Sequence, residues 1–412
     1  MKAQIFKYFS ALLLLLVPFL SQAQYKYDNI VLRDSIKVRN KRASNIYQMA
    51  YVALPVITAG FIIKGQDKNF RNLRDSYVPS FRYYYDDFLQ YLPGITMYGL
   101  KICGVEGYSS WKRMITTDVM ASCFMIAAVE SLKSTSKVTR PDGSNRKSFP
   151  SGHTAIAFMT ATMVHKEYGL TRSPWYSVGA YSVATTVAVS RIMNNKHWMS
   201  DVLVGAGVGV LSTEIGYYLS ELIFKERGIV RNYLPIKFLP NDFKPSFLGL
   251  YVGFNEMIGN YKLLNDTKFK FSAGSNAGAE GAWFFNQNFG IGGRATVSGM
   301  YVSMKGDNND RQMHLASGYI GGYYSLNIGG RWFIGTKMLF GCNYSSEHKL
   351  SDIKIGGRCA LSAGTGVNLR YITYNNMGVK FFTDYNMMDS LLESGGQLNH
   401  QMTIGGSVDI CF

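Results

Sequence analysis

The chain has 412 residues and a formal net charge of +16 at pH 7. This length exceeds one ordinary domain and predicts two. Residues 24–240 hold 27 basic against 15 acidic residues, so nearly all the excess positive charge lies there, which favours a polyanionic partner. The sequence has no helix-turn-helix, zinc-finger or RNA-binding signature, so we expect no nucleic acid.

The amino-terminus has the pattern of a secretory signal peptide over residues 1–23. Lys2 and Lys7 precede the apolar run 11–20, and a small-x-small site at 21–23 precedes Gln24. Because the run is shorter than the ~20 residues of a membrane-spanning helix, an uncleaved anchor is the less favoured alternative. We therefore expect the mature chain to leave the cytoplasm.

Residues 24–228 are predicted to form an all-α helical bundle. Apolar blocks between Gly, Pro and charge clusters predict helices at roughly 46–63, 81–100, 112–131, 152–168, 174–192 and 198–224. Only the uncharged stretches 43–63 and 173–190 approach the length that spans a membrane. We interpret the helices mainly as buried core helices of a secreted bundle.

Residues 229–245 are predicted to be a linker, because Pro235, Pro240 and Pro245 lie there among charged residues. Over 246–412 the apolar period changes to two. The alternation recurs over 247–255, 274–285, 290–304, 313–328, 331–345, 354–373, 377–388 and 399–412. Short turns at 286–288, 327–330 and 374–376 alternate with longer polar loops, as in transmembrane β-barrels.

The predicted fold class is therefore multidomain α and β, with an all-α helical bundle followed by an eight-stranded antiparallel transmembrane β-barrel. A soluble β-sandwich is the alternative, but glycines at many polar-face positions favour a narrow, packed barrel interior. Eight strands enclose side chains rather than a channel. They also place the first and last residues of the barrel segment on the periplasmic side, so the helical bundle would face the periplasm.

The cysteines predict neither a disulfide framework nor a zinc site, because they are widely scattered without a C-x-x-C pair. They are Cys103, Cys123, Cys342, Cys359 and Cys411. The sequence shows no cluster of metal-ligand residues, so we predict that the chain uses no metal and no cofactor.

Three segments of the helical region gather charged and acid-base side chains, at 133–141, 150–153 and 190–201. Arg140 and Arg191 offer planar forks that match phosphate oxygens, and Lys133 adds a point charge. Ser151 and Gly152 open a helix whose backbone N–H groups would point at an anion. These residues predict an anion site.

Two histidines and one carboxylate add acid-base capacity to this site. His197 and Asp201 lie four residues apart, so on a helix the carboxylate can fix the tautomer of the imidazole. A neutral, oriented imidazole can attack phosphorus, and His153 can protonate the leaving oxygen.

The three segments fit the pattern K-(x)6-R-P, P-S-G-H, S-R-(x)5-H-(x)3-D without a departure. This resembles the type 2 phosphatidic acid phosphatases and the vanadium haloperoxidases, directly over about 70 residues and as a helical domain over about 180. The resemblance implies that His197 is the nucleophile, Asp201 orients it and His153 is the general acid. It also implies a phosphate-binding set of Lys133, Arg140, Ser151, Gly152 and Arg191.

The resemblance implies a metal-independent phosphatase acting on a phosphorylated envelope lipid. The lipid A phosphatases, which remove the 1- or 4′-phosphate, are the nearest likeness. Undecaprenyl pyrophosphate, phosphatidylglycerophosphate and soluble phosphate esters stay open as substrates. A vanadium haloperoxidase is a remote alternative, and a non-enzymatic adhesion or structural protein would leave the motif residues idle.

The expected location is the outer membrane, with the catalytic domain in the periplasm. The inner membrane with a periplasm-facing active site is the alternative. The stretch 64–91 mixes basic with aromatic residues and is interpreted as a lid, a surface for lipid headgroups or an ordinary amphipathic face. The sequence does not indicate an oligomeric state.

Overall fold

The computed structural model describes residues 51–233, 243–259, 261–262, 268–271, 273–304, 311–345, 348–350, 353–355, 359–373, 377–390 and 398–412. The predicted signal peptide at 1–23, most of the predicted linker and the predicted turn at 374–376 lie outside these ranges.

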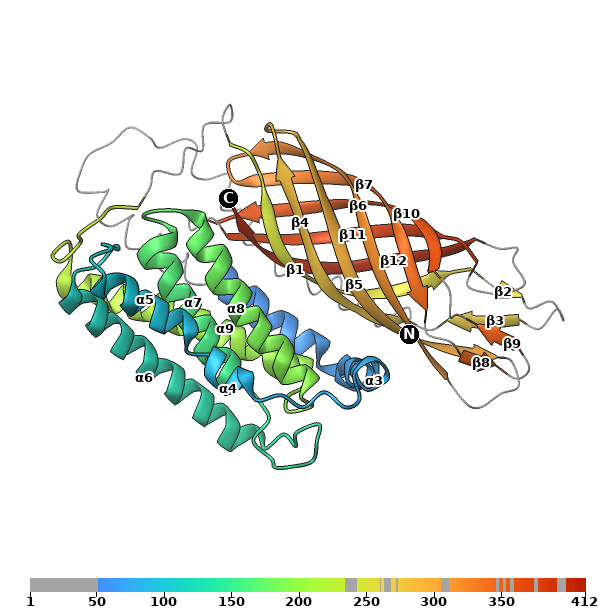
Figure 1. Cartoon of the computed structure of the whole chain (residues 1–412), viewed down its shortest axis with the longest axis horizontal. Coiled ribbons are helices and arrows are strands. Elements are labelled where there is room, and N and C mark those ends of the chain that lie inside the picture. Colours follow the sequence, from blue (N-terminus) through green and yellow to red (C-terminus); the bar gives the residue numbers. More distant parts are fainter. Residues whose placement is uncertain are drawn as a thin grey trace. The chain divides into compact units, whose positions relative to one another are not determined.

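The described part of residues 51–233 is helical (Figure 1). A helix over 51–63 is followed by η1 (Lys64–Gln66), α3 (Asp67–Tyr77), α4 (Tyr85–Leu89), α5 (Leu92–Ile102), α6 (Trp111–Ser136), α7 (Gly152–Val164), the π-helical turn η2 (His165–Gly169), α8 (Pro174–Met193) and α9 (Met199–Phe224).

Two predicted helices differ from the structure. The single helix expected at 81–100 is divided into α4 and α5, because Pro93 in the first turn of α5 has no N–H to continue the hydrogen-bond ladder. The helix expected at 152–168 is α-helical only to Val164, where the π-helical turn begins.

Glycines let α7 and α9 approach each other closely. A Cβ atom at Gly205 would lie 2.5 Å from the carbonyl oxygen of Ser151, and one at Gly209 would lie 2.3 Å from that of Ala155. Because Gly205 and Gly209 are four residues apart, they share one face of α9. The Ser151 N–H also donates to the carbonyl oxygen of Asp201 at 3.0 Å. This contact joins the amino-terminal ends of α7 and α9.

The expectation of buried core helices fits α9 but not α6. Both helices are long and apolar enough to cross a membrane by length and composition. However, 72% of the most apolar 18-residue window of α9 is buried, against 28% in α6. The outer side of α6 exposes Trp111, Ile115, Val119 and Ile126. This helix therefore presents apolar side chains outward.

The strands of the second region are β1 (Phe247–Ile258), β2 (Tyr261–Lys262), β3 (Lys268–Phe271), β4 (Gly274–Phe284), β5 (Phe289–Met304), β6 (Arg311–Gly329), β7 (Trp332–Ser345), β8 (His348–Leu350), β9 (Ile353–Ile355), β10 (Cys359–Ile372), β11 (Met377–Met388) and β12 (Asn399–Cys411). The strand expected at 354–373 is thus divided between β9 and β10.

Eight of these strands close into an antiparallel barrel in the order β5-β4-β1-β12-β11-β10-β7-β6, with β6 pairing back to β5. The first and last strands pair along their whole length, from Phe247 opposite Cys411 to Ile258 opposite His400. The closed barrel confirms the predicted fold class and excludes the β-sandwich.

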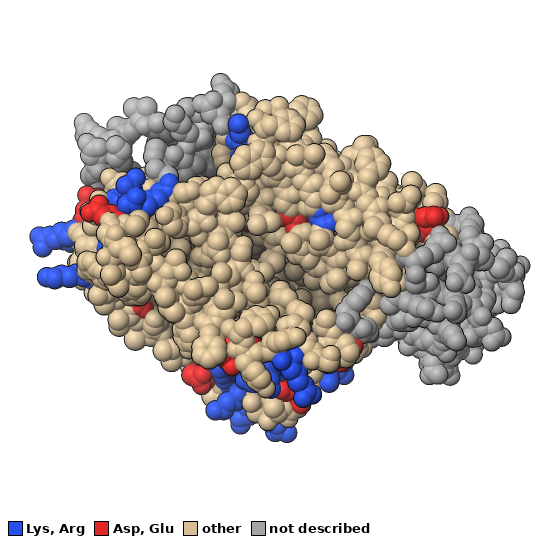
Figure 2. Space-filling view, viewed as in Figure 1, with Lys and Arg blue, Asp and Glu red and all other residues tan. Residues whose placement is uncertain are grey.

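The barrel strands alternate between a charged, buried interior and an apolar exterior. Exposed side chains include Ile291, Ile320, Phe340 and Leu361, and the side of the barrel visible in Figure 2 is nearly all uncharged. An apolar exterior around a polar interior is the arrangement of a barrel that faces lipid.

Ion pairs fill the barrel interior. Glu280 pairs with Lys337 and, at 2.6 Å, with Lys380. Asp384 pairs with Arg294 and, at 2.8 Å, with Lys337. Side chains therefore occupy the lumen, as expected for eight strands.

Candidate active site

The eight residues of the sequence motifs lie where α6 and α8 end and where α7 and α9 begin. Ser151 caps α7 and its Oγ accepts from the Thr154 N–H, which leaves the first turn of the helix open toward an anion. A Cβ atom at Gly152 would lie 3.2 Å from the Nζ of Lys133. The missing side chain at Gly152 therefore lets the Lys133 ammonium approach the start of α7.

Arg140 lies on the loop between α6 and α7, and this loop is fastened to the segment before α9. Asp142 pairs with Lys196 at 2.7 Å, and the Trp198 indole donates to the carbonyl oxygen of Thr139 at 2.8 Å. Burial and the nearby guanidinium of Arg191 lower the pKa of Arg140. The two guanidinium groups therefore act on one region of the site.

Buried donors in this region lack protein acceptors. The Nε atoms of Arg140 and Arg191 have no hydrogen-bond partner among the residues that the structure describes. Two neighbouring cations with unsatisfied N–H groups are suited to an anion with several oxygens, such as phosphate.

His197 is 3% exposed and lies beside Asp201, with 3.5 Å between its Nδ1 and the Asp201 Oδ2. This is an ion-pair distance rather than a hydrogen bond. The same carboxylate oxygen accepts from the Ser148 Oγ at 2.5 Å and from the Trp198 N–H at 2.9 Å. Asp201 is therefore fixed before it acts on the imidazole, and Nε2 is the His197 nitrogen left to face a substrate.

Burial lowers the pKa of His197 to about 4, against the opposing influence of Asp201 and with the help of Arg191 and Arg140. The imidazole is therefore neutral at pH 7, which is the form that carries a lone pair for attack.

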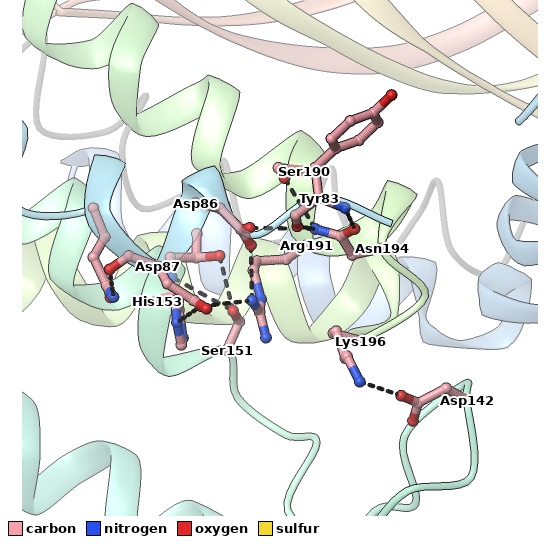
Figure 3. Close-up of polar contacts among 12 residues, drawn as sticks. Tyr83, Asp86, Asp87, Asp142, Ser151, His153, Ser190, Arg191, Asn194 and Lys196 are labelled. Atoms are coloured by element: carbon pink, nitrogen blue, oxygen red, sulfur yellow. Dashed lines mark hydrogen bonds and ion pairs between the residues drawn. The ribbon is translucent and has the colours of Figure 1, made fainter. Parts of the chain in front are cut away.

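His153 has different surroundings, because its Nε2 lies 2.8 Å from the Oδ1 of Asp87 on α4 (Figure 3). Burial and Arg191 lower the pKa of His153, while Asp87 and Asp86 raise it. A carboxylate at hydrogen-bond distance favours the protonated imidazole. The net effect still lowers the pKa of His153, with Asp87 opposing the influence of burial.

Sequence reasoning missed Ser148, Asp86 and Asp87, which contact motif side chains. Asp86 Oδ2 lies 2.7 Å from the Nη1 of Arg191, and Asp87 Oδ1 lies 3.4 Å from the same nitrogen (Figure 3). Both acids belong to the stretch 64–91 that the sequence left open as a lid or a surface. The available signal was two adjacent carboxylates within a basic segment.

The arrangement combines an anion cradle, a neutral buried imidazole and an imidazole beside a carboxylate. These are the parts needed to attack a phosphate ester and to protonate its leaving group. Within the described ranges, no group of three His, Cys, Asp or Glu side chains is arranged to hold a metal ion.

Comparisons with known proteins agree with this geometry. The PAP2 superfamily pattern matches residues 127–224. A protein named Lipid A 1-phosphatase, from Porphyromonas gingivalis, is 43% identical over 175 residues, which span 42% of this chain and 39% of the relative. The chain thus covers about two fifths of that relative's length.

Two solved structures each align with part of this chain. Neisserial surface protein A aligns with 40% of this chain and 97% of its own, at a TM-score of 0.31 and 9% identity. LpxE of Aquifex aeolicus aligns with 35% of this chain and 93% of its own, at a TM-score of 0.28 and 22% identity. The segment 127–224 that the PAP2 superfamily pattern matches runs from within α6 to the end of α9.

Proposed function

We propose that the chain is a metal-independent phosphatase that removes a phosphate group from an envelope lipid through a phosphohistidine on His197. The observation that carries this proposal is a buried, neutral imidazole at His197 beside the guanidinium groups of Arg191 and Arg140, with Arg191 also acting on the imidazole of His153. The relative named Lipid A 1-phosphatase supports lipid A as the substrate and favours the 1-phosphate.

The reaction has two steps. In the first, the Nε2 of His197 attacks phosphorus, the bond from phosphorus to the leaving oxygen breaks, and His153 gives its proton to that oxygen. In the second, water attacks the phosphohistidine and gives a proton to His153, and the phosphorus–nitrogen bond breaks. Lys133, Arg140, Arg191 and the first turn of α7 stabilise the charge on the phosphoryl oxygens.

An apolar surface beside the site supports a lipid substrate. We define the apolar face of α4–α6 by the exposed side chains Phe88, Ile95, Ile102, Ile115 and Val119. Phe88 is 78% exposed and follows Asp87 in the sequence. In Figure 2 the charged groups of the helical region gather at its two ends and leave the band between them almost uncharged. Exposed apolar side chains on a surface with few charges are typical of a membrane contact.

The barrel supports an outer-membrane location. Its exposed side chains are apolar and its interior is charged, which is the distribution that lipid requires. Because the number of strands is even, the chain enters and leaves the barrel on the same side of the membrane. The helical domain would therefore lie on the periplasmic side. The predicted signal peptide is consistent with this route.

The deciding experiment is phosphate release by the purified full chain from a panel of lipids. The panel contains lipid A with one or both phosphates, undecaprenyl pyrophosphate and phosphatidylglycerophosphate, with His197→Ala as the inactive control. We expect release from lipid A and label on the wild-type protein after an alkaline quench of labelled substrate, because phosphohistidine is labile in acid. A fully active His197→Ala enzyme would contradict the mechanism.

Two reagents test the chemistry of the site independently of the lipid. Activity should survive EDTA, and vanadate should inhibit as a five-coordinate mimic of the transferred phosphoryl group. Complete loss of activity in EDTA with recovery in magnesium would contradict the proposal. Bromide oxidation with vanadate and peroxide, without phosphate release, would assign the chain to the haloperoxidase chemistry instead.

A further inference from the structure

Two adjacent carboxylates outside all the motifs reach into the candidate site from α4. Asp86 and Asp87 both approach the Nη1 of Arg191, but only Asp87 also contacts His153 (Figure 3). The Oδ1 of Asp87 lies 2.8 Å from the Nε2 of His153, a full hydrogen bond, and 3.4 Å from Arg191. Its principal partner is therefore the histidine.

The two carboxylates differ in burial and therefore in what they contribute. The side chain of Asp86 is 1% exposed, and it accepts from the Asn194 amide at 3.2 Å as well as from Arg191. The side chain of Asp87 is 46% exposed. Asp86 is thus the buried counter-ion that Arg191 needs, whereas Arg191 does not need Asp87 for its own pairing.

The short helix α4 is held in place by the end of α8. The Tyr83 N–H donates to the Asn194 Oδ1 at 2.9 Å, and the Asn194 amide donates to the Tyr83 carbonyl at 2.7 Å. The position of Asp87 next to His153 is therefore fixed by a reciprocal pair of hydrogen bonds, not by a freely moving loop.

A half-exposed carboxylate beside a phosphate site repels a negatively charged substrate. Its position there therefore requires a function that outweighs this repulsion. We propose that Asp87 is a positioning residue for His153, accepting its Nε2–H so that Nδ1 faces the leaving oxygen. This inference rests on the proposed phosphatase function.

The proton account balances around this contact. In the first step the Nδ1 proton of His153 passes to the leaving oxygen as the phosphorus–oxygen bond breaks. The Nε2 proton stays on the imidazole and remains hydrogen-bonded to Asp87. In the second step Nδ1 takes a proton from the attacking water. Asp87 remains ionised throughout, as the orienting carboxylate of a catalytic histidine does in general.

The charged groups that face His153 come from three elements. Asp87 and Asp86 lie on α4, Arg191 on α8, and the Lys133 ammonium from α6 reaches the neighbouring Gly152. Burial and Arg191 lower the pKa of His153, and Asp87 opposes this more strongly than Asp86 does. Removing the charge of Asp87 should therefore lower the pH at which His153 loses its proton.

The test compares Asp87→Asn, Asp87→Glu and Asp86→Asn in the full chain, with Glu106→Gln as a control at an exposed acid outside the site. Asp87→Asn should lose about 10–100-fold in kcat on an alkyl phosphate, the usual effect of an orienting partner. It should lose much less on nitrophenyl phosphate, which needs no proton. The basic limb of kcat/KM should move to lower pH, and Asp87→Glu should restore part of both effects.

Histidine-selective nitrogen NMR of the full chain, assigned with His153→Gln, reads the tautomer and titration of His153 without turnover. If no substrate is hydrolysed but Asp87→Asn shifts this titration, the proposed function fails and the pairing stands. Equal losses on both leaving groups, an unmoved basic limb, or a faster Asp87→Asn enzyme with tighter phosphate binding would overturn the proposal. The last result would mean that Asp87 occupies the place of the substrate's phosphate and does not position His153.

Discussion

The surroundings of the two histidines lower the pKa of both, and different neighbours oppose the effect of burial in each case. His197 is buried next to Arg191 and Arg140, so its pKa falls to about 4. His153 is more exposed and has a carboxylate at 2.8 Å, which partly offsets the lowering effect of burial and Arg191. The proposed roles require a neutral His197 and a protonated His153, and Asp87 favours the protonated form of His153.

This difference predicts the pH dependence of the reaction. His197 must be deprotonated and His153 protonated, so kcat/KM should rise with pH through about 4 and fall again below the ordinary histidine value of 6.5. Rates on a soluble ester between pH 3 and 9 give the profile. A maximum above pH 8 would contradict these assignments, and His153→Ala should remove the descending limb.

Motif spacing selected eight candidate site residues, and the structure places them near helix ends, one of which the pattern marks with Pro150, Ser151 and Gly152. The sequence did not reveal Asp86 and Asp87. Their contact with Arg191 bridges about 105 positions, and nothing in the run from Tyr83 to Asp87 indicates which way a carboxylate points. Ser148, two residues before Pro150, was missed for the same reason.

At the scale of elements, the crossing of α7 and α9 sets the distances within the site. The Cβ atom of an alanine at Gly209 would lie 2.3 Å from the Ala155 carbonyl oxygen, so the helices must separate to accept it. We expect Gly209→Ala to destabilise the helical domain by about 1–3 kcal/mol and to lower kcat, because Ser151 and His197 move apart.

Gly179, on the exposed side of α8, is the matched control. Its Cβ atom would meet nothing within 4 Å, so Gly179→Ala should leave kcat unchanged and add up to about 1 kcal/mol of stability through helix propensity. Denaturant unfolding of the full chain, followed by the helical circular dichroism signal, measures the free energy of unfolding of both variants. Equal stability of the two variants would show that the close crossing is not needed.

The barrel has a corresponding prediction at its buried Glu280. Glu280→Gln leaves Lys337 and Lys380 without their shared carboxylate, and breaking a buried pair costs about 3–5 kcal/mol. The barrel should therefore lose its compact, heat-modifiable migration on gels at a lower temperature than wild type. Glu256→Gln, on an exposed position of β1, should behave as wild type. An unchanged transition in Glu280→Gln would argue against an ion-paired interior.

The strands were easier to predict than the helices. Alternation fixes which side chains of β1 and β12 face inward, because a shift of one residue would move every inward side chain to the outer face. Helix boundaries depend on single residues, so Pro93 divided a predicted helix. The outward apolar side of α6 was not anticipated, because a helix apolar enough to be a core helix is also apolar enough to contact lipid.

At the scale of the whole molecule, the catalytic residues and the barrel strands belong to separate parts of the chain. In the part of the chain that the structure describes, the motif residues and the carboxylates that contact them lie between Asp86 and Asp201, and the barrel strands begin at Phe247. The chemistry and the membrane attachment are therefore separable in principle. The full chain should accordingly fractionate with outer membranes; inner-membrane fractionation would overturn this location but leave the chemistry unaffected.

Separating the two parts is the last prediction. Residues 24–240, purified in mild detergent because of the apolar face of α4–α6, should retain hydrolysis of small water-soluble esters at a rate close to that of the full chain. They should lose most of the activity on lipid in vesicles, because anchoring by the barrel raises the effective concentration of enzyme at the bilayer. Equal activity of both forms on vesicles would assign membrane attachment to the helices alone. A folded, helical fragment that is inactive on soluble esters would instead make the barrel part of the catalyst.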